Sequence, residues 1–201
     1  EGNINSERLI AMLNVVDDQL VVEHKGIYSV EKFLVARRLM YWQVYLHKTV
    51  LSAEFLLMKI LKRAKEITQR GAAVFATSPM KLFLSENIDA DRMKNPEVLN
   101  MFSQLDDMDV FVCIKEWINS DDKVLSELSK MLVNRKLLKV KQKQEPFSEQ
   151  EINEFKDRYS NPYNFSNQEL ENFIFQDAIS NHAYDSQKDE IKIVFKNGDI
   201  K

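Results

Sequence analysis

The sequence predicts a mainly helical chain with a smaller α+β segment at its C-terminal end. Apolar residues recur at helical spacing through most of the first two-thirds of the 201 residues, and the chain has only four glycines and four prolines. In the last third, helical patterning gives way to short alternating stretches that favour strands. We therefore expect a helical segment over residues 1–135 and a small α+β segment over residues 136–201.

The N-terminal third should be mostly helix. A short helix is expected within "NINSERLIAMLN", where Asn5 or Ser6 can cap the first turn. A short strand is expected in "DQLVVEHKG". Residues 28–69 carry helical periodicity without glycine or proline, which predicts one very long helix, or two helices joined by a kink, ended by Gly71.

Capping signals predict further helices along the chain. Pro96 suits a first helical turn in "NPEVLNMFSQL", and aspartate pairs open "DDMDVFVCIKEWI" and "DDKVLSELSKMLVNRKLL". Ser148 and Glu151 have the spacing of a capping box. Strands are expected in "LLKVKQK", "FIFQDAI" and "IKIVF". An Asn-Gly turn signal and three residues follow the last of these, so we expect a hairpin and a truncated C-terminal segment.

The composition indicates a globular protein of the cytoplasm. The chain is 44% hydrophobic and 29% charged, with a formal net charge of -3, which disfavours extended nucleic-acid binding. It lacks an apolar run of 18 residues, so no membrane span is expected. Cys113 is the single cysteine, which excludes a disulfide framework, and its apolar surroundings predict an inert core residue.

The stretch "ARRLMYWQVYLHKTV" carries the main candidate site. At helical spacing, Arg37, Tyr41 and Tyr45 form one ridge, and Lys48 falls within it. A guanidinium, two phenols and an ammonium suit the phosphates and sugar of a nucleotide. The alternative is ordinary packing, because long core helices often hold tyrosines and cations at their rim.

The same stretch, extended to "YSVEKFLVARRLMYWQVYLHKTV", resembles the long helix that follows the catalytic core in HD-superfamily deoxynucleoside triphosphate triphosphohydrolases, including bacterial relatives. The shared pattern is Ala-Arg-x-x-x-Tyr followed by Tyr-x-His-Lys. The likeness is clearest over residues 5–65, extends more weakly through "LDDMDVFVCIKEW" and "LSELSKMLVNRKLLKV", and is not claimed for residues 146–201. It implies the C-terminal portion of an HD-type helical fold and a homo-oligomer.

The resemblance also implies roles for individual residues. Arg37 matches an arginine that contacts the substrate triphosphate, and Tyr45 matches a tyrosine that lies against the sugar. Tyr41 stands where relatives have a histidine near the substrate. Lys48 and Lys25 match basic positions of a regulatory nucleotide site in the vertebrate enzyme. Glu23 falls where that enzyme has an arginine, which argues against the same regulation here.

A metal site is expected outside this chain. HD enzymes gather a histidine, a His-Asp pair and a later aspartate around one or two metals. None of the three histidines is followed by aspartate; these are His24, His47 and His182. In the family that this chain resembles, those ligands lie upstream of the matching segment. The resemblance therefore implies that the divalent metal of a full-length parent enzyme binds upstream, and that this chain alone is inactive and without a bound metal or catalytic residue.

Several other features have both a structural and a functional interpretation. His47 could act as a general base or could be a packed or solvated side chain. The acidic run could bind a cation or cap a helix; it contains Asp106, Asp107 and Asp109. The basic stretch could contact a nucleotide or a neighbouring subunit, or could be a solvated edge strand; its lysines are Lys136, Lys139, Lys141 and Lys143.

These observations lead to one expected function and one alternative. We expect part of a metal-dependent nucleotide phosphohydrolase, with deoxynucleoside triphosphates as substrates and this chain supplying phosphate and sugar contacts. The alternative is a non-enzymatic helical module for oligomerisation or protein interaction, in which the ridge is packing.

Overall fold

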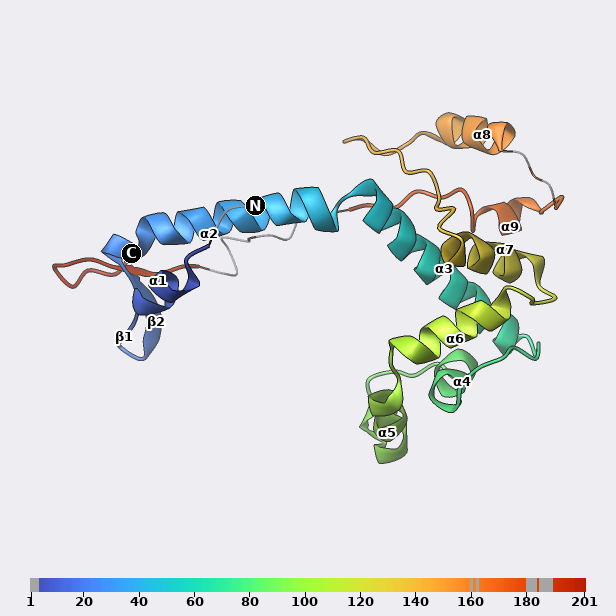
Figure 1. The fold of residues 1–201 in the computed structure, drawn as a ribbon, viewed down its shortest axis with the longest axis horizontal. Helices are drawn as coiled ribbons and strands as arrows, with labels where there is room; N and C mark the ends of the chain where they lie inside the picture. Colours follow the sequence, from blue (N-terminus) through green and yellow to red (C-terminus); the bar gives the residue numbers. More distant parts are fainter. Residues whose placement is uncertain (1–3, 160, 162, 180–183, 185–189) are drawn as a thin grey trace. The chain divides into compact units, whose positions relative to one another are not determined.

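The computed structural model describes residues 4–159, 161, 163–179, 184 and 190–201 (Figure 1). The chain divides into two units, one formed by residues 1–50 with 178–201 and the other by residues 51–177. The expected segments 1–135 and 136–201 cut across these units, because the C-terminal residues cluster with the N-terminal fifty. The mainly helical fold class is confirmed; the structure adds a small three-stranded sheet.

The first unit opens with a helix and a hairpin. Helix α1 (Ser6–Ala11) is capped by Asn5, whose side-chain oxygen accepts a hydrogen bond from the Arg8 backbone N–H at 3.0 Å. Strands β1 (Leu13–Val16) and β2 (Gln19–Glu23) pair antiparallel. The two-residue turn between them, Asp17–Asp18, has positive φ at both positions, as in a type I′ turn. Sequence patterning found β2 but missed β1.

The sheet is completed by the other end of the chain. Strand β3 (Ile193–Val194) runs parallel to β2, with Val22 opposite Ile193, and Figure 1 shows this red C-terminal segment beside the blue hairpin. After the Asn197–Gly198 turn the chain returns, and Ile193 and Lys201 exchange two backbone hydrogen bonds of 2.7 and 3.0 Å. The C-terminal hairpin expected from the Asn-Gly signal is therefore confirmed.

The single long helix expected over residues 28–69 is wrong, and the alternative of two helices joined by a kink is right. Helix α2 (Ile27–Met40) passes into a π-helix (Tyr41–Tyr45), and α3 (Lys48–Gln69) begins after a break. The Leu46 N–H donates to the Tyr41 carbonyl at 2.8 Å, one residue beyond α-helical reach, which widens the turn. The Nδ1 atom of His47 then accepts from the Thr49 N–H at 3.3 Å, which provides a local cap for α3.

The second unit contains the remaining helices. They are α4 (Ser78–Ser85), α5 (Pro96–Gln104), α6 (Asp107–Trp117), α7 (Lys123–Val133), α8 (Glu149–Arg158) and α9 (Asn167–Leu170). The capping signals were interpreted correctly: Pro96 opens α5, and Ser148 and Glu151 form the expected capping box of α8. The strands expected at residues 137–143 and 173–179 are wrong, because neither stretch has a neighbouring strand to pair with among the described residues.

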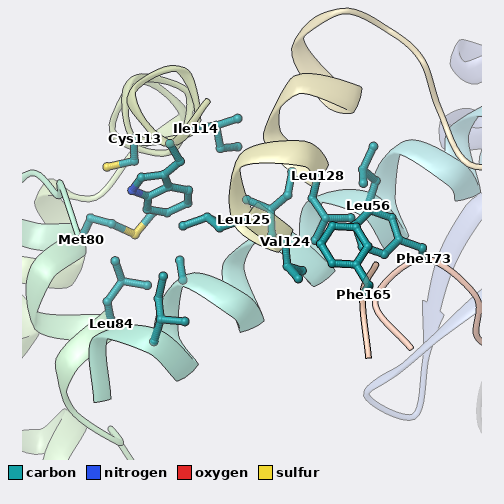
Figure 2. Close-up of a cluster of buried hydrophobic side chains, with 14 of the residues drawn as sticks. Leu56, Met80, Leu84, Cys113, Ile114, Val124, Leu125, Leu128, Phe165 and Phe173 are labelled. Carbon is teal, nitrogen blue, oxygen red and sulfur yellow. The ribbon is translucent and has the colours of Figure 1, made fainter. Parts of the chain in front are cut away.

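A buried apolar cluster holds the second unit together. Figure 2 shows Cys113 and Met80 at one end of this cluster and the rings of Phe165 and Phe173 at the other, beside Leu56 and Leu128. The two rings are stacked, with centres 5.1 Å apart, which explains why the apolar stretch around Phe173 packs into the core instead of forming a strand. Cys113 is fully buried, as expected, and burial raises the pKa of its thiol.

An ion pair fixes α3 against the start of α7. The Arg63 guanidinium donates to both carboxylate oxygens of Asp122, at 3.1 and 2.6 Å, and also to Glu66 at 3.1 Å. Asp122 in turn caps α7 by accepting from the Leu125 N–H at 2.8 Å. Burial disfavours the Asp122 carboxylate, but the hydrogen bonds from Arg63 and Leu125 outweigh it and hold its pKa below the ordinary value.

Candidate functional site

Three of the expected site residues form a continuous ladder at the end of α2. Arg37 lies in the last turn of α2, and Tyr41 and Tyr45 open and close the π-helix. The guanidinium carbon of Arg37 lies 5.5 Å from the Tyr41 ring centre. The rings of Tyr41 and Tyr45 meet edge to face, with centres 5.1 Å apart and an angle of 62° between planes. We call these three residues the Arg-Tyr ladder.

The side chains of the ladder stay in contact across the change from α-helix to π-helix at Tyr41. The widened π-turn takes more residues per turn than an α-helix, so side chains four apart stay nearly aligned. Arg37 and Tyr45 are exposed, whereas Tyr41 between them is half-buried. The two ends of the ladder thus present exposed surface, and the half-buried middle residue contacts both of them.

Lys48 does not share the helix of the ladder. It begins α3, after the break at Leu46 and His47, so the spacing that placed it on the ridge does not apply. Lys25 lies in a short 3-10 helix (His24–Gly26), where its ammonium pairs with Glu23 at 3.0 Å. Glu23, which stands where the vertebrate enzyme has an arginine, thus forms an ion pair with Lys25, one of the two lysines expected to bind a regulatory nucleotide.

The acidic run near α6 is a helix cap. Asp106 accepts from the Met108 N–H at 2.8 Å and the Asp109 N–H at 3.2 Å, and Asp109 accepts from the Asp106 N–H at 3.1 Å. This reciprocal box confirms the structural interpretation of "LDDMD". In the part of the chain that the structure describes, no group of three or more histidine, cysteine or acidic side chains could hold a metal ion.

The two histidines in the described part of the chain make contacts with protein groups. His24 stacks at a tilt against Phe195, with ring centres 4.7 Å apart, within the first unit. His47 caps α3 through its ring nitrogen, which is a structural role. His182 lies outside the described residues. The described residues thus do not provide the ligand set that an HD-type metal needs.

The basic stretch before α8 contacts one aromatic ring within that helix and one just before it. The Lys141 ammonium lies 4.4 Å from the Phe155 ring centre, and Lys143 lies 4.5 Å from the Phe147 ring centre. Lys143 also pairs with Glu151 at 2.7 Å. These lysines attach α8 to the chain before it, in place of the solvated edge strand expected from the sequence. Exposed cations remain at Lys136 and Lys139, for which nucleotide or subunit contact stays a prediction.

Sequence patterning missed one unusual cation in the second unit. Lys59 on α3 donates to the Glu171 carbonyl at 2.8 Å, and its ammonium lies 4.2 Å from the Phe175 ring centre. Burial, followed by the neighbouring charge of Lys62, lowers the pKa of Lys59. Its spacing from the buried Leu56 and Ile60 could have indicated a partly buried position. Its partners show that it ties the chain near residue 171 to α3.

Comparisons with known proteins relate the chain to HD-type phosphohydrolases. Residues 4–80, which contain the whole Arg-Tyr ladder, match the family model described as "HD associated region". The chain is similar along its full length to a crystal structure of a phosphohydrolase from Bacteroides thetaiotaomicron, with 45% identity and a TM-score of 0.91. It is also 31% identical over 136 residues to the uncharacterized protein YwfO of Bacillus subtilis.

The similarity covers only part of each of these proteins. The chain spans half of the solved phosphohydrolase chain and 30% of YwfO, while 68% of this chain takes part in the match to YwfO. The coarse relationship to HD-type phosphohydrolases is thus supported by two independent comparisons. Among the described residues, no helix is both long and apolar enough to cross a membrane.

Proposed function

We propose that this chain is part of a metal-dependent phosphohydrolase that cleaves deoxynucleoside triphosphates, and that the Arg-Tyr ladder is one wall of its substrate site. The supporting observation is the ladder itself: an exposed arginine and two contacting tyrosines within the HD-associated region. The metal ligands would come from residues outside this sequence, because the described residues have no suitable cluster. The chain on its own would then be inactive.

The chemistry of the ladder fits the charge and shape of such a substrate. Arg37 presents a planar fork of N–H donors that matches phosphate oxygens, and its positive charge offsets the negative charge of a triphosphate. Tyr45 exposes 53% of its surface and can lay its ring against a flat or apolar sugar face. Tyr41 lies between the two and contacts both of them.

A comparison of neighbouring arginines tests this function. In the full-length protein, Arg37→Ala should lower turnover of deoxynucleoside triphosphates by about 10- to 150-fold, since a charge-assisted hydrogen bond contributes about 1.5–3 kcal/mol. Arg38→Ala is the matched control, because one residue of helix turns it away from the ladder. Steady-state rates and thermal melts should be measured together. Equal losses in the two variants, or losses explained by unfolding, would contradict the proposed site.

Lys25 and Lys48 would bind a second, regulatory nucleotide. This role can be tested at Lys25. The Glu23 carboxylate holds the Lys25 ammonium, so a nucleotide phosphate must compete with this ion pair. Removing the acidic competitor with Glu23→Gln should therefore strengthen any activation of turnover by added nucleotide. Unchanged activation in Glu23→Gln would remove Lys25 from the regulatory site.

The exposed apolar surface of α2 favours a second candidate function, a helical oligomerisation module. A helix that is apolar around most of its circumference is normally covered, yet Ala36 is the only buried residue of α2. Tyr28, Val35, Leu39 and Trp42 line one exposed stripe of this helix and its π-helical extension. A non-enzymatic module predicts that Leu39→Glu dissociates a homo-oligomer in sedimentation experiments, and that nucleotides never bind to the full-length protein.

A further inference from the structure

We propose that Tyr41 is a positioning residue, whose ring orders the Arg37 guanidinium and the Tyr45 ring for substrate, and that its hydroxyl takes no part. This inference rests on the proposed function and specifies how the middle of the Arg-Tyr ladder contributes to it. The ring of Tyr41 is the shared partner of the other two side chains, at 5.5 Å from the Arg37 guanidinium carbon and 5.1 Å from the Tyr45 ring centre.

Tyr41 is itself fixed from both sides of the helix junction. Its backbone N–H donates to the carbonyls of Arg37 and Arg38, in the last turn of α2. Its own carbonyl accepts the Leu46 N–H at 2.8 Å, which closes the π-turn. The residue therefore belongs to both hydrogen-bond patterns, and its half-buried ring has less freedom than the exposed side chains on either side.

Ordering these two side chains before substrate arrives has an energetic consequence. A free arginine has several rotatable bonds, and restricting them on binding costs affinity. An aromatic face within about 6 Å attracts the guanidinium and limits its positions, while an edge-to-face partner does the same for a neighbouring ring. Both interactions need the ring of residue 41 and neither needs its hydroxyl. Phenylalanine should therefore replace Tyr41, and leucine should not.

The first measurement follows the contact itself and requires no enzymatic activity. The Arg37 Nε–Hε resonance, assigned by its disappearance in Arg37→Lys, should carry a ring-current shift in the full-length protein. Tyr41→Phe should keep that shift, and Tyr41→Leu should move the resonance toward the position of the Arg38 Nε–Hε signal. An Arg37 signal that is the same in wild type, Tyr41→Phe and Tyr41→Leu would overturn the ordering role even if the protein hydrolyses no nucleotide.

The second measurement is a double-mutant cycle on turnover. Tyr41→Leu should lower kcat/KM by about tenfold, which corresponds to about 1.4 kcal/mol for the two ring contacts together. Tyr41→Phe, which keeps the ring, should lose much less than Tyr41→Leu. In an Arg37→Ala background much of the Tyr41→Leu loss should disappear, since Tyr41 acts largely through Arg37. Equal losses in the Phe and Leu variants would show a direct role for the hydroxyl and would overturn the inference.

A matched aromatic pair elsewhere controls for stability. Phe83 and Phe102, in the second unit, also meet edge to face, with centres 6.0 Å apart. Phe102→Leu should change the melting temperature about as much as Tyr41→Leu and leave kcat/KM unchanged. If Tyr41→Leu lowers kcat/KM by the same factor in the Arg37→Ala background as in wild type, Tyr41 does not act through Arg37 and the positioning role is contradicted. An unchanged rate in Arg37→Ala alone would instead contradict the proposed function.

Discussion

The guanidinium carbon of Arg37 lies 5.5 Å from the ring centre of Tyr41, one turn further along the chain. The contact joins a charged group, which suits phosphate, to a residue at the exact junction where α-helix becomes π-helix. Single π-turns recur at functional sites. The pairing therefore links a local irregularity of the backbone to the proposed substrate wall.

Arg37→Lys should retain part of the function of Arg37. Lysine keeps the positive charge, but it lacks the planar fork of donors and the flat surface that rests on an aromatic ring. We expect turnover of deoxynucleoside triphosphates to fall between wild type and Arg37→Ala. Steady-state kinetics with the three proteins would check this order. Full activity in Arg37→Lys would mean that the site uses only a point charge.

Arg63→Met should destabilise the second unit by about 2 kcal/mol, somewhat less than the loss for a fully buried pair. The substitution leaves Asp122 largely buried without its two-point partner, and only 20% of that side chain is exposed. Chemical denaturation should reveal the loss. Arg70→Ala is the control, because Arg70 pairs with Glu66 at the surface, and such pairs contribute about 0–1 kcal/mol. Similar losses in both variants would contradict the special role of the Arg63–Asp122 pair.

Glu151 should titrate far below an ordinary glutamate. The ion pair with Lys143 and the Ser148 backbone N–H lower the pKa of Glu151 from 4.5 to about 2. A carboxyl group with a lowered folded-state pKa stabilises the fold above its unfolded pKa, and this contribution disappears as the pH falls from about 4.5 to about 2.

Carboxyl chemical shifts recorded against pH would measure the Glu151 titration directly. Lys143→Gln should move the midpoint upward toward the ordinary value, because it removes the largest cause of the shift. A Glu151 midpoint that stays near 2 in Lys143→Gln would show that the helix cap alone causes the shift.

Gly26→Ala should lower the stability of the first unit through a steric clash. An added Cβ would lie 2.8 Å from the Met12 Cβ and 2.9 Å from a Val22 methyl group. Because the Met12 Cβ is fixed to the backbone, the hairpin or the start of α2 must shift, and we expect a loss of about 1–3 kcal/mol. Thermal melts would test this.

Gly71→Ala provides the comparison for that clash. At Gly71 an added Cβ meets nothing within 4 Å, and its φ of +91° alone causes strain. Backbone strain of this kind costs about 1–2 kcal/mol for a residue other than glycine. The double variant Gly26→Ala with Val22→Ala should recover part of the loss, and the Gly71→Ala loss should not respond to Val22→Ala. An unchanged melting temperature in Gly26→Ala would show that the hairpin can shift to make room for the added Cβ without loss of stability.

The sequence by itself determined features that depend on neighbours within one or two turns. Asn95, Asp106, Asp122 and Ser148 each cap the helix that follows them, because a side-chain oxygen needs only the next few backbone N–H groups as partners. The Arg-Tyr ladder was likewise predictable, since residues four apart meet on α- and π-helices alike. The chemistry of the candidate site was therefore visible before any long-range contact was known.

The tertiary structure decided what depends on distant partners. A strand is stable only beside another strand. Residues 193–194 form β3 because β2, some 170 positions away in the sequence, lies next to them. The similar stretch at 173–179 instead packs its rings into a core. The sequence allowed a kink between two helices but did not place it at Leu46 and His47, because the helical periodicity over residues 28–69 runs across this position. Local patterns fix caps and faces; the pairing of remote segments fixes which apolar stretch becomes strand, helix or core.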